Sequence, residues 1–375
     1  MQVVVFLAII GILIMAELFY YRKHALDDVD LEVKFSKPVA QFGEIIEVIE
    51  KAENRKRVPL PFLILKFETP AVLEFQDMTK TTLSDFLYRE DMVSMKPFSR
   101  HTRTIKARCS KRGYYSFARI NISTTDLLLI EKINRDYTTD TSVTILPEYV
   151  DTSMLNSFLS ITLSDIQRKR TLLTDPFSFA GIRDYQPWDS MKSINWTASA
   201  KTGDLMVNQV ASTATKKVSV YVNLDFYNNK KSTSLIEKSI SFAYSYVQEL
   251  VATGIPVMLY TNGRDIQTKA PVIAESPCDN TNFLQRAIAL ARIDLTQEVV
   301  PFEELFEGKS GNLADEFIVI VSTCSYDQVR EAIRKLKNRG ASLLWIMPAY
   351  KTTPRPELEA DLARDFRVWE VIGHD

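Results

Sequence analysis

Asp225 is the residue of this chain best placed to bind a metal ion. It lies next to the end of an apolar run at 218–226, which predicts a strand, and it opens the segment Asp225-Phe-Tyr227-Asn-Asn229. Asn229 is a weaker oxygen ligand, and Thr281 or Thr323 could add hydroxyls. Because Asp225 is the single carboxylate of this set, the sequence favours a degenerate site. In that interpretation Asp225 caps the next segment or accepts hydrogen bonds from the loop. No cofactor is predicted, and Mg²⁺ stays open as the alternative.

Other residues that carry catalysis or bind cofactors are scarce. The 11 glycines form neither GxGxxG nor GxxxxGK[ST], so no phosphate-binding loop is predicted. The 3 cysteines are far apart, which predicts buried thiols in a reducing compartment. The 3 histidines are isolated, so general acid–base catalysis has no support. These residues are Cys109, Cys278, Cys324, His24, His101 and His374.

The charge balance argues against nucleic acid as a partner. The formal net charge is −1 over 375 residues, so no global field attracts a polyanion. Two local basic clusters lie at 55–57 and 168–170. At this net charge we interpret both as solvated loop charge rather than as polyanion sites.

The densest group of polar and aromatic residues lies at 181–210. Arg183 and Asp189 are expected to form an ion pair, and Trp196 to pack under a sheet edge, so that the segment clasps the following domain. The alternative is an exposed recognition surface, because Arg, Tyr and Trp are favoured at binding hot spots. Both can hold together. The candidate residues for partner binding or clasping are Arg183, Asp184, Tyr185, Asp189, Trp196 and Lys201.

The N-terminus predicts a transmembrane anchor at 1–23. Residues 3–21 are almost all apolar and long enough, at 1.5 Å per residue, to cross a hydrocarbon core of about 30 Å. Glu17 falls near the interface, and no cleavage signal follows. The first basic residues, Arg22 and Lys23, come after the span. By the positive-inside rule the chain is a single-pass cell-membrane protein whose bulk faces the cytoplasm.

Residues 31–150 predict an immunoglobulin-like β-sandwich. Short runs with partial alternation, such as 31–35, 62–68 and 103–109, are separated by polar or proline-containing stretches. The run from Thr79 to Met95 does not fit, and we expect a helix or a long loop there.

The remainder predicts a linker helix and arm at 151–215, then an α/β domain at 216–375. In the latter, apolar strands alternate with amphipathic helices, which is typical of a doubly wound, mostly parallel sheet. The first helix should start at the capping box Ser234-Leu-Ile-Glu237 and end at Gly254. Pro354 and Pro356 should lead the last helix. Ligands in such sheets sit at the carboxyl ends of strands, so we expect function in the loops that follow Asp225, Thr261 and Ser322. Those three residues mark the strand ends.

The arm resembles a known family signature. Its matching residues are Ile182-Arg183-Asp184-Tyr185, Asp189, Ile194, Trp196 and Ser199-Ala200-Lys201. On these residues the chain resembles bacterial membrane proteins of the domain-of-unknown-function class numbered fifty-eight. The resemblance implies a von Willebrand factor A-like fold and association with MoxR-type AAA+ ATPases. It also implies a role in assembly, maturation or envelope-linked processes.

The chain departs from the family pattern at several positions. Trp188 stands where the family has glycine, and Asp225-x-Tyr227-x-Asn229 replaces the Asp-x-Ser-x-Ser of the metal-dependent adhesion site. No carboxylate stands near Ser322, where a later aspartate is expected, and one span replaces the two of many members. We therefore expect a non-catalytic scaffold that binds protein without metal. The alternatives are a divalent-metal hydrolase, a metal-dependent adhesin that uses Asp225, and an extracellular adhesin of inverted topology.

Overall fold

The structure is a computed structural model. It describes residues 2–70, 72–75, 81–83, 86–117, 120–126, 128–150, 152–172, 179–187, 189–210, 217–225, 230–273, 276–306 and 313–372. The chain divides into two compact units. One comprises Met1–Glu148 with Ala287–Arg292, and the other Tyr149–Arg286 with Ile293–Asp375. The domain boundaries predicted from the sequence at residues 23, 31, 150 and 215 stay predictions.

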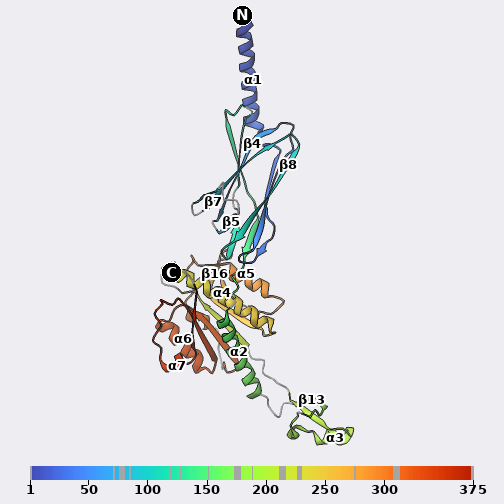
Figure 1. The fold of residues 1–375 in the computed structure, drawn as a ribbon, viewed down its shortest axis with the longest axis vertical. Coiled ribbons are helices and arrows are strands. Elements are labelled where there is room, and N and C mark those ends of the chain that lie inside the picture. Colours follow the sequence, from blue (N-terminus) through green and yellow to red (C-terminus); the bar gives the residue numbers. More distant parts are fainter. Residues whose placement is uncertain are drawn as a thin grey trace. The chain divides into compact units, whose positions relative to one another are not determined.

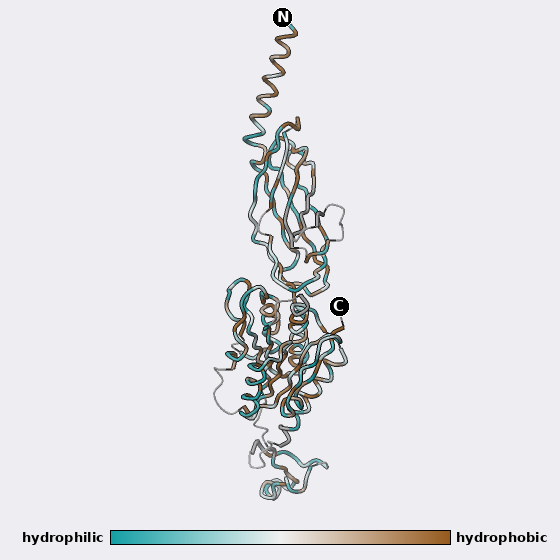
Figure 2. Tube along the Cα trace, turned by 90° about the vertical axis from the view of Figure 1, so that its left-hand side faces the viewer, coloured by the Kyte–Doolittle hydropathy of each residue, from teal (hydrophilic) through white to brown (hydrophobic). Residues whose placement is uncertain are grey.

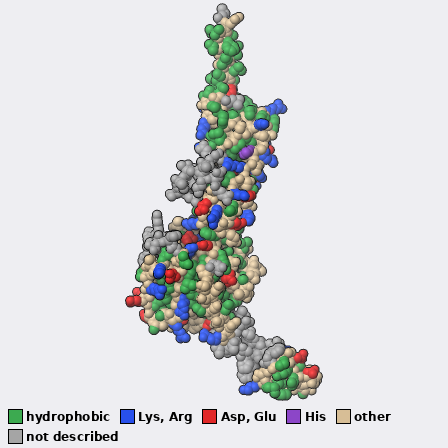
Figure 3. Space-filling model, in the orientation of Figure 1, with side chains coloured by type: hydrophobic (Ala, Val, Ile, Leu, Met, Phe, Trp, Pro, Cys, Tyr) green, Lys and Arg blue, Asp and Glu red, His purple; other side chains and the backbone are tan. Residues whose placement is uncertain are grey.

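The first element is α1, Gln2–His24, whose side chains are apolar and mostly exposed up to Phe19 (Figures 1 and 3). Among the described residues it is the one helix long and apolar enough to cross a membrane. Its last turn is fixed to the domain that follows, because the Tyr21 hydroxyl donates to the backbone oxygen of Pro59 at 3.0 Å. The predicted N-terminal apolar helix is confirmed.

The rest of the first unit is a β-sandwich (Figure 1). One sheet has the order β1-β3-β8-β5, a second has the order β11-β10-β4-β7-β6, and a small third sheet has the order β2-β12-β9. Their bounds are β1 Val29–Phe35, β2 Val39–Ala40, β3 Ile45–Asn54, β4 Leu60–Pro70, β5 Leu73–Phe75, β6 Thr81–Leu83, β7 Phe86–Met95, β8 Ser99–Cys109, β9 Gly113–Ser116, β10 Ile120–Thr125, β11 Lys132–Tyr137 and β12 Ser142–Ile145.

The two large sheets share a core. One buried cluster joins Val29 of β1 and Ala52 of β3 to Leu63 of β4 and Ile122 of β10. Leu26, just after α1, belongs to the same cluster. Side chains that alternate along each strand and meet face to face define a sandwich, so the predicted class of this region is confirmed.

The expectation of a helix or long loop at Thr79 to Met95 is wrong. Residues 81–83 and 86–95 form β6 and β7, and β7 pairs antiparallel with β4 from Pro70↔Phe86 to Leu60↔Met95. Several polar residues interrupt the apolar alternation that would predict a strand in this run. The long antiparallel pairing with β4 stabilises the strand despite this weak local preference.

The second unit starts with α2, Ser153–Leu172, in agreement with the predicted linker helix. An arm follows, made of β13 Phe179–Asp184, η2 Met191–Ser193, α3 Trp196–Thr202 and β14 Met206–Val210. The remaining elements are β15 Lys217–Asn223, α4 Lys230–Ala252, β16 Val257–Asp265, β17 Pro271–Ile273, α5 Phe283–Ala291, β18 Ile293–Asp294, η3 Phe302–Phe306, β19 Glu316–Ser322, α6 Asp327–Asn338, β20 Ser342–Ala349, α7 Ala360–Ala363 and β21 Phe366–Glu370.

The sheet of this unit is mostly parallel, with the order β17-β16-β15-β19-β20-β21. β15 pairs parallel with β16 on one side and with β19 on the other, so the strand order reverses at β15. Trp345, Ile320 and Tyr221 pack against α6. On α4, Phe242 packs against Trp369 of β21, with ring centroids 4.9 Å apart. Ligand crevices of parallel sheets open at such a reversal, beyond the carboxyl ends of the strands.

Helix boundaries agree with the sequence at the C-termini better than at the N-termini. Gly254, with φ 79°, donates its N–H to Val251 and closes α4 as predicted. However, α4 begins at Lys230, so Ser234 lies inside the helix and does not cap it. Residues 230–233 contain no glycine or proline, and therefore nothing stops the helix from extending one turn. The last helix begins at Ala360, well after Pro354 and Pro356.

Candidate functional site

The carboxyl ends of β15, β16 and β19 bring a group of polar side chains together. Asn223 ends β15 and Asp225 follows two residues later, Asn262 lies at the level of Asn223 within β16, and Ser322 ends β19. These strands are parallel neighbours, so their ends meet at one edge of the sheet. The sequence predicted function in the loops that follow Asp225, Thr261 and Ser322. Asn223, Asn262 and Ser322 do lie together, but the prediction that the second strand ends at Thr261 is wrong, because β16 continues to Asp265 and pairs there with β17 and β18. The loop after Asp225 lies outside the described residues.

Asn262 connects the ends of β15 and β16. Its side-chain oxygen accepts the Leu224 N–H at 2.8 Å. Its amide nitrogen donates to Oδ1 of Asn223 at 3.2 Å and to Oδ1 of Asp225 at 2.7 Å. Asn262 is completely buried. One amide side chain thus fixes the backbone and both polar side chains at the end of β15.

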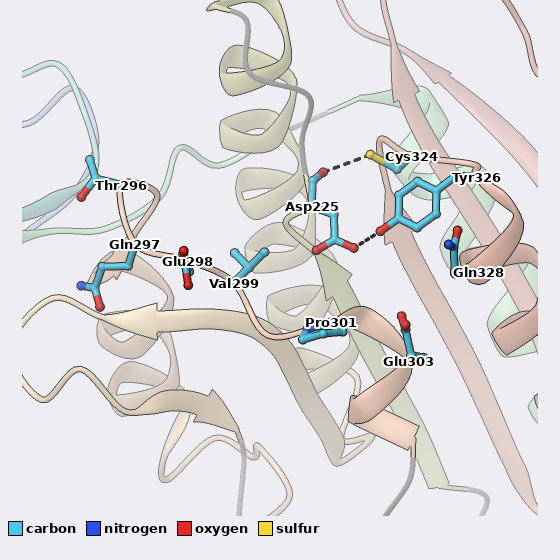
Figure 4. A pocket seen from close by; sticks show the side chains of 10 residues that line it. All are labelled: Asp225, Thr296, Gln297, Glu298, Val299, Pro301, Glu303, Cys324, Tyr326 and Gln328. Atoms are coloured by element: carbon cyan, nitrogen blue, oxygen red, sulfur yellow. Dashed lines mark hydrogen bonds between the residues drawn. The ribbon is translucent and has the colours of Figure 1, made fainter.

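The loop after β19 closes the group from the other side. Ser322 receives a hydrogen bond from Asn223 at 3.1 Å and donates to the backbone oxygen of Cys324 at 2.8 Å. The Cys324 thiol lies 3.0 Å from the backbone oxygen of Asp225, to which it donates. The Tyr326 hydroxyl donates to Oδ2 of Asp225 (Figure 4). Burial raises the pKa of the Cys324 thiol, and the thiol acts here as a hydrogen-bond donor.

An open pocket of about 750 Å³ lies over this group. Its lining includes Asp225, Cys324 and Tyr326 on one side and the segment Thr296–Val299 on the other (Figure 4). Asp225, Glu298 and Glu303 contribute carboxylates, and no Lys or Arg is among the described residues of the lining. The arrangement suits a polar or cationic group of a partner better than an anion.

Among the described residues, Asp225 has too few oxygen ligands around it for an octahedral Mg²⁺. Asn262 and Tyr326 each donate a hydrogen bond to one of its carboxylate oxygens. No group of three His, Cys, Asp or Glu able to hold a metal occurs in the described part of the chain. Thr281 donates its hydroxyl to Asp279 at 2.6 Å, so it is used elsewhere. Thr323 lies next to Cys324, with its oxygen 3.8 Å from the sulfur. Tyr227 and Asn229 lie outside the described residues.

Replacing Asp225 with Asn tests the charge at this edge of the sheet. Burial raises the pKa of Asp225, and the charge of Glu303 adds to the rise, although bonds from Tyr326 and Asn262 oppose both. Since the folded pKa lies above the unfolded one, the carboxylate lowers stability as the pH rises above about 4. We expect Asp225→Asn to be as stable as the parent chain or slightly more stable at pH 7, by under about 1 kcal/mol. Urea unfolding at pH 4 and pH 7 measures this. A variant much less stable at pH 7 would contradict it.

The arm at 179–210 is held together by its own bonds. β13 and β14 pair antiparallel from Asp184↔Met206 to Phe179↔Val210. Asn195 caps α3 by accepting the Ala198 N–H at 2.9 Å, and its amide donates to Asn208 at 2.7 Å. Gly203, with φ 84°, ends α3. Asn195 and Gly203 therefore stabilise the two ends of α3 within the arm.

The predicted pair of Arg183 and Asp189 is present. The guanidinium makes two parallel bonds to the carboxylate, of 2.6 and 2.7 Å, and the Gln186 N–H donates to the same carboxylate at 2.9 Å. Arg183 holds the pKa of Asp189 below its ordinary value through these bonds. Arg183 therefore closes the loop at 184–189. Its side chain is 38% exposed, and its contact with a partner stays a prediction. The clasp onto the α/β sheet stays a prediction.

The other predicted arm residues differ in exposure. Trp196 is the first residue of α3 and is 63% exposed, so the expectation that it packs under a sheet edge is wrong. A first-turn position lets the indole project away from Ile194 and Val207, which form the small buried contact of the arm. Asp184 and Lys201 are exposed and Tyr185 is half-buried. Trp188 lies outside the described residues.

Sequence reasoning missed Asn262, Cys324 and Tyr326 as members of the site. Each lies in a loop or strand end that was singled out, one to four residues after Thr261 or Ser322. Their residue types gave no signal by themselves, because their partners come from β15.

No family model matches the chain, and no curated protein matches it. Part of the chain is similar to several solved structures. A CARDB domain from Pyrococcus furiosus is 18% identical and matches 32% of this chain and 92% of its own, with a TM-score of 0.21. A type II cohesin domain from the cellulosome of Acetivibrio cellulolyticus is 15% identical (31% and 94% covered, TM-score 0.23). A non-cellulosomal cohesin from Archaeoglobus fulgidus is 14% identical (34% and 97% covered, TM-score 0.22). TM-scores of this size carry no conclusion about function.

Proposed function

We propose that the chain is a membrane-anchored, non-catalytic scaffold that binds another protein. In this proposal α1 is a single-pass anchor and the bulk of the chain faces the cytoplasm. The mostly parallel sheet is of the von Willebrand A type, with a degenerate metal site. By the family resemblance, the partner is a MoxR-type AAA+ ATPase, in assembly, maturation or envelope-linked processes.

The observation that carries the proposal is the arm. It folds through its own hairpin, cap and ion pair, and it presents Trp196 at 63% exposure. A large aromatic side chain held on a rigid element is the residue type most enriched at binding hot spots. Figure 3 shows apolar side chains gathered on the visible face of this arm. Met191 and Leu205 are also exposed there.

The state of Asp225 supports the same proposal and weakens its rivals. A metal-dependent adhesin or a metal hydrolase needs several oxygen ligands around the ion. Among the described residues, Asp225 belongs to no group of three His, Cys, Asp or Glu side chains that could hold a metal.

Substitution of Trp196 tests the proposal. We expect Trp196→Ala to lower recovery of the partner with tagged full-length chain from solubilised membranes by at least about tenfold, the typical effect at a hot spot. Met92→Ala, which removes an exposed apolar residue of the β-sandwich, is the matched control. Mass spectrometry identifies the partner. Equal recovery with both variants would remove the arm from the interface, and a partner other than an AAA+ ATPase would remove the proposed class.

A further inference from the structure

The tip of the β10–β11 hairpin exposes three consecutive apolar side chains. Leu128 is 47%, Leu129 58% and Ile130 63% exposed. Single exposed aliphatic residues are ordinary, but a contiguous group on one loop marks a surface that contacts something else.

Hydrogen bonds to one buried side chain hold the backbone of the hairpin tip in place. Asp126 is completely buried, and its carboxylate accepts the backbone N–H groups of Leu128 (3.1 Å), Ile130 (2.8 Å) and Glu131 (2.6 Å). Leu129 has φ 60°, a conformation that is unfavourable for a bulky side chain. A buried carboxylate therefore holds a strained turn whose effect is to present apolar side chains outward.

The tip lies beside the end of α1. Glu131 is 3.6 Å from Arg22, the residue after the apolar span. The Tyr21 side chain is buried and bonded to Pro59, so the sandwich begins where the apolar part of α1 stops. Figure 2 shows hydrophobic chain at the top of the sandwich, at the end from which α1 leaves. The tip is thus at the depth of a membrane interface if α1 spans the bilayer.

Both basic and acidic side chains lie at this end of the sandwich, where Arg22 pairs with Glu131 and Arg55 with Asp30. Arg22 and Lys23 are exposed at the end of α1. Arg55 and Arg57 are exposed in the loop after β3, and Lys56 of that loop donates to the backbone oxygens of His24 and Ala25. Apolar residues beside charged side chains match the acyl and headgroup layers of a membrane surface.

We propose that Leu128, Leu129 and Ile130 insert into the same bilayer that α1 crosses, with the neighbouring Arg and Lys side chains at the headgroups. The inference rests on the proposed membrane anchor. One helix alone lets a domain tilt about its attachment, whereas a second contact fixes the orientation of the sandwich relative to the membrane.

Fluorescence quenching in vesicles tests the insertion. The full chain is reconstituted into phosphatidylcholine and phosphatidylglycerol vesicles that contain lipids with a nitroxide near the headgroup. A nitrobenzoxadiazole label is placed on Ile130→Cys, on Ile9→Cys within α1, or on Phe42→Cys. Phe42 is an exposed apolar residue in the loop before β3, about 30 Å along that strand from the α1 contact. The native cysteines are buried, and labelling of the parent chain gives the background.

We expect the label at Ile130 to be quenched at least about twofold more than the label at Phe42, as an interfacial residue would be. If Ile9 is quenched and Ile130 behaves like Phe42, the insertion is refuted and the anchor stands. If Ile130 is shielded from water but not quenched, a protein covers the tip and the insertion is again refuted. Absence of quenching at all three sites would refute the anchor and the insertion together.

Discussion

Asn262→Ala is expected to lower the free energy of unfolding of the α/β unit by about 3 kcal/mol. The side chain is completely buried and makes three hydrogen bonds, one to a backbone group and two to side chains of β15 and its loop. Alanine leaves the buried Leu224 N–H without an acceptor. It also removes one donor from Asp225. Each buried group left unpaired costs about 1–3 kcal/mol, so the losses accumulate at one point of the sheet.

Asn282→Ala is the matched control for this prediction. Asn282 also uses both ends of its amide, as a donor to Pro277 at 2.9 Å and as an acceptor of the Asp279 N–H at 2.9 Å, but these bonds are exposed. Water replaces them, so we expect a loss under about 1 kcal/mol. Native-state hydrogen exchange of β15 and β16 reports the α/β unit separately from the sandwich, because two units need not unfold together. Equal losses in both variants would show that burial is not the cause.

The strand-end site shows how far sequence reasoning reaches. Apolar strands that alternate with helices predicted a parallel sheet, and such a sheet brings Asn223, Asn262 and Ser322 to one level on neighbouring strands. What could not be predicted is which donors Asp225 accepts. Tyr326 lies 101 residues away along the chain, and its contact depends on the register of β15 with β19 and on the path of one loop.

Local signals failed where tertiary contacts compete with them. A capping box at Ser234 is a valid start signal, but the helix extends to Lys230 because nothing in the preceding turn opposes it. The region of β7 lacks clean alternation, yet it forms ten residues of strand on the ladder of β4. The sequence predicts that Trp196 packs under a sheet edge, but in the first turn of α3 its side chain is 63% exposed.

Asp126→Ala is expected to cost the sandwich about 3 kcal/mol and to loosen the hairpin tip, because hydrogen bonds to a buried charged group contribute about 1.5–3 kcal/mol each and part of the loss is regained by relaxation. The buried carboxylate is the acceptor of three backbone N–H groups within six residues. It also maintains Leu129 at positive φ, a conformation that the free chain avoids. Without it, the strained turn keeps only two backbone bonds, from Leu129 to Asp126 and from Asp126 to Glu131, and relaxation of the tip should expose the end of β10.

Asp126→Asn separates the charge from the geometry. The amide keeps one oxygen, which can accept the bonds of Ile130 and Glu131 now made to Oδ1, but it loses the acceptor for Leu128 now made to Oδ2. We therefore expect Asp126→Asn to be less stable than the parent chain but more stable than Asp126→Ala. Hydrogen exchange of the Ile130 and Glu131 amides should increase strongly in the alanine variant and weakly in the asparagine variant. If both variants retained the protection of the parent chain, the tip would be held by the β10–β11 ladder alone. The strained, apolar turn would then need no buried carboxylate to present it to a membrane.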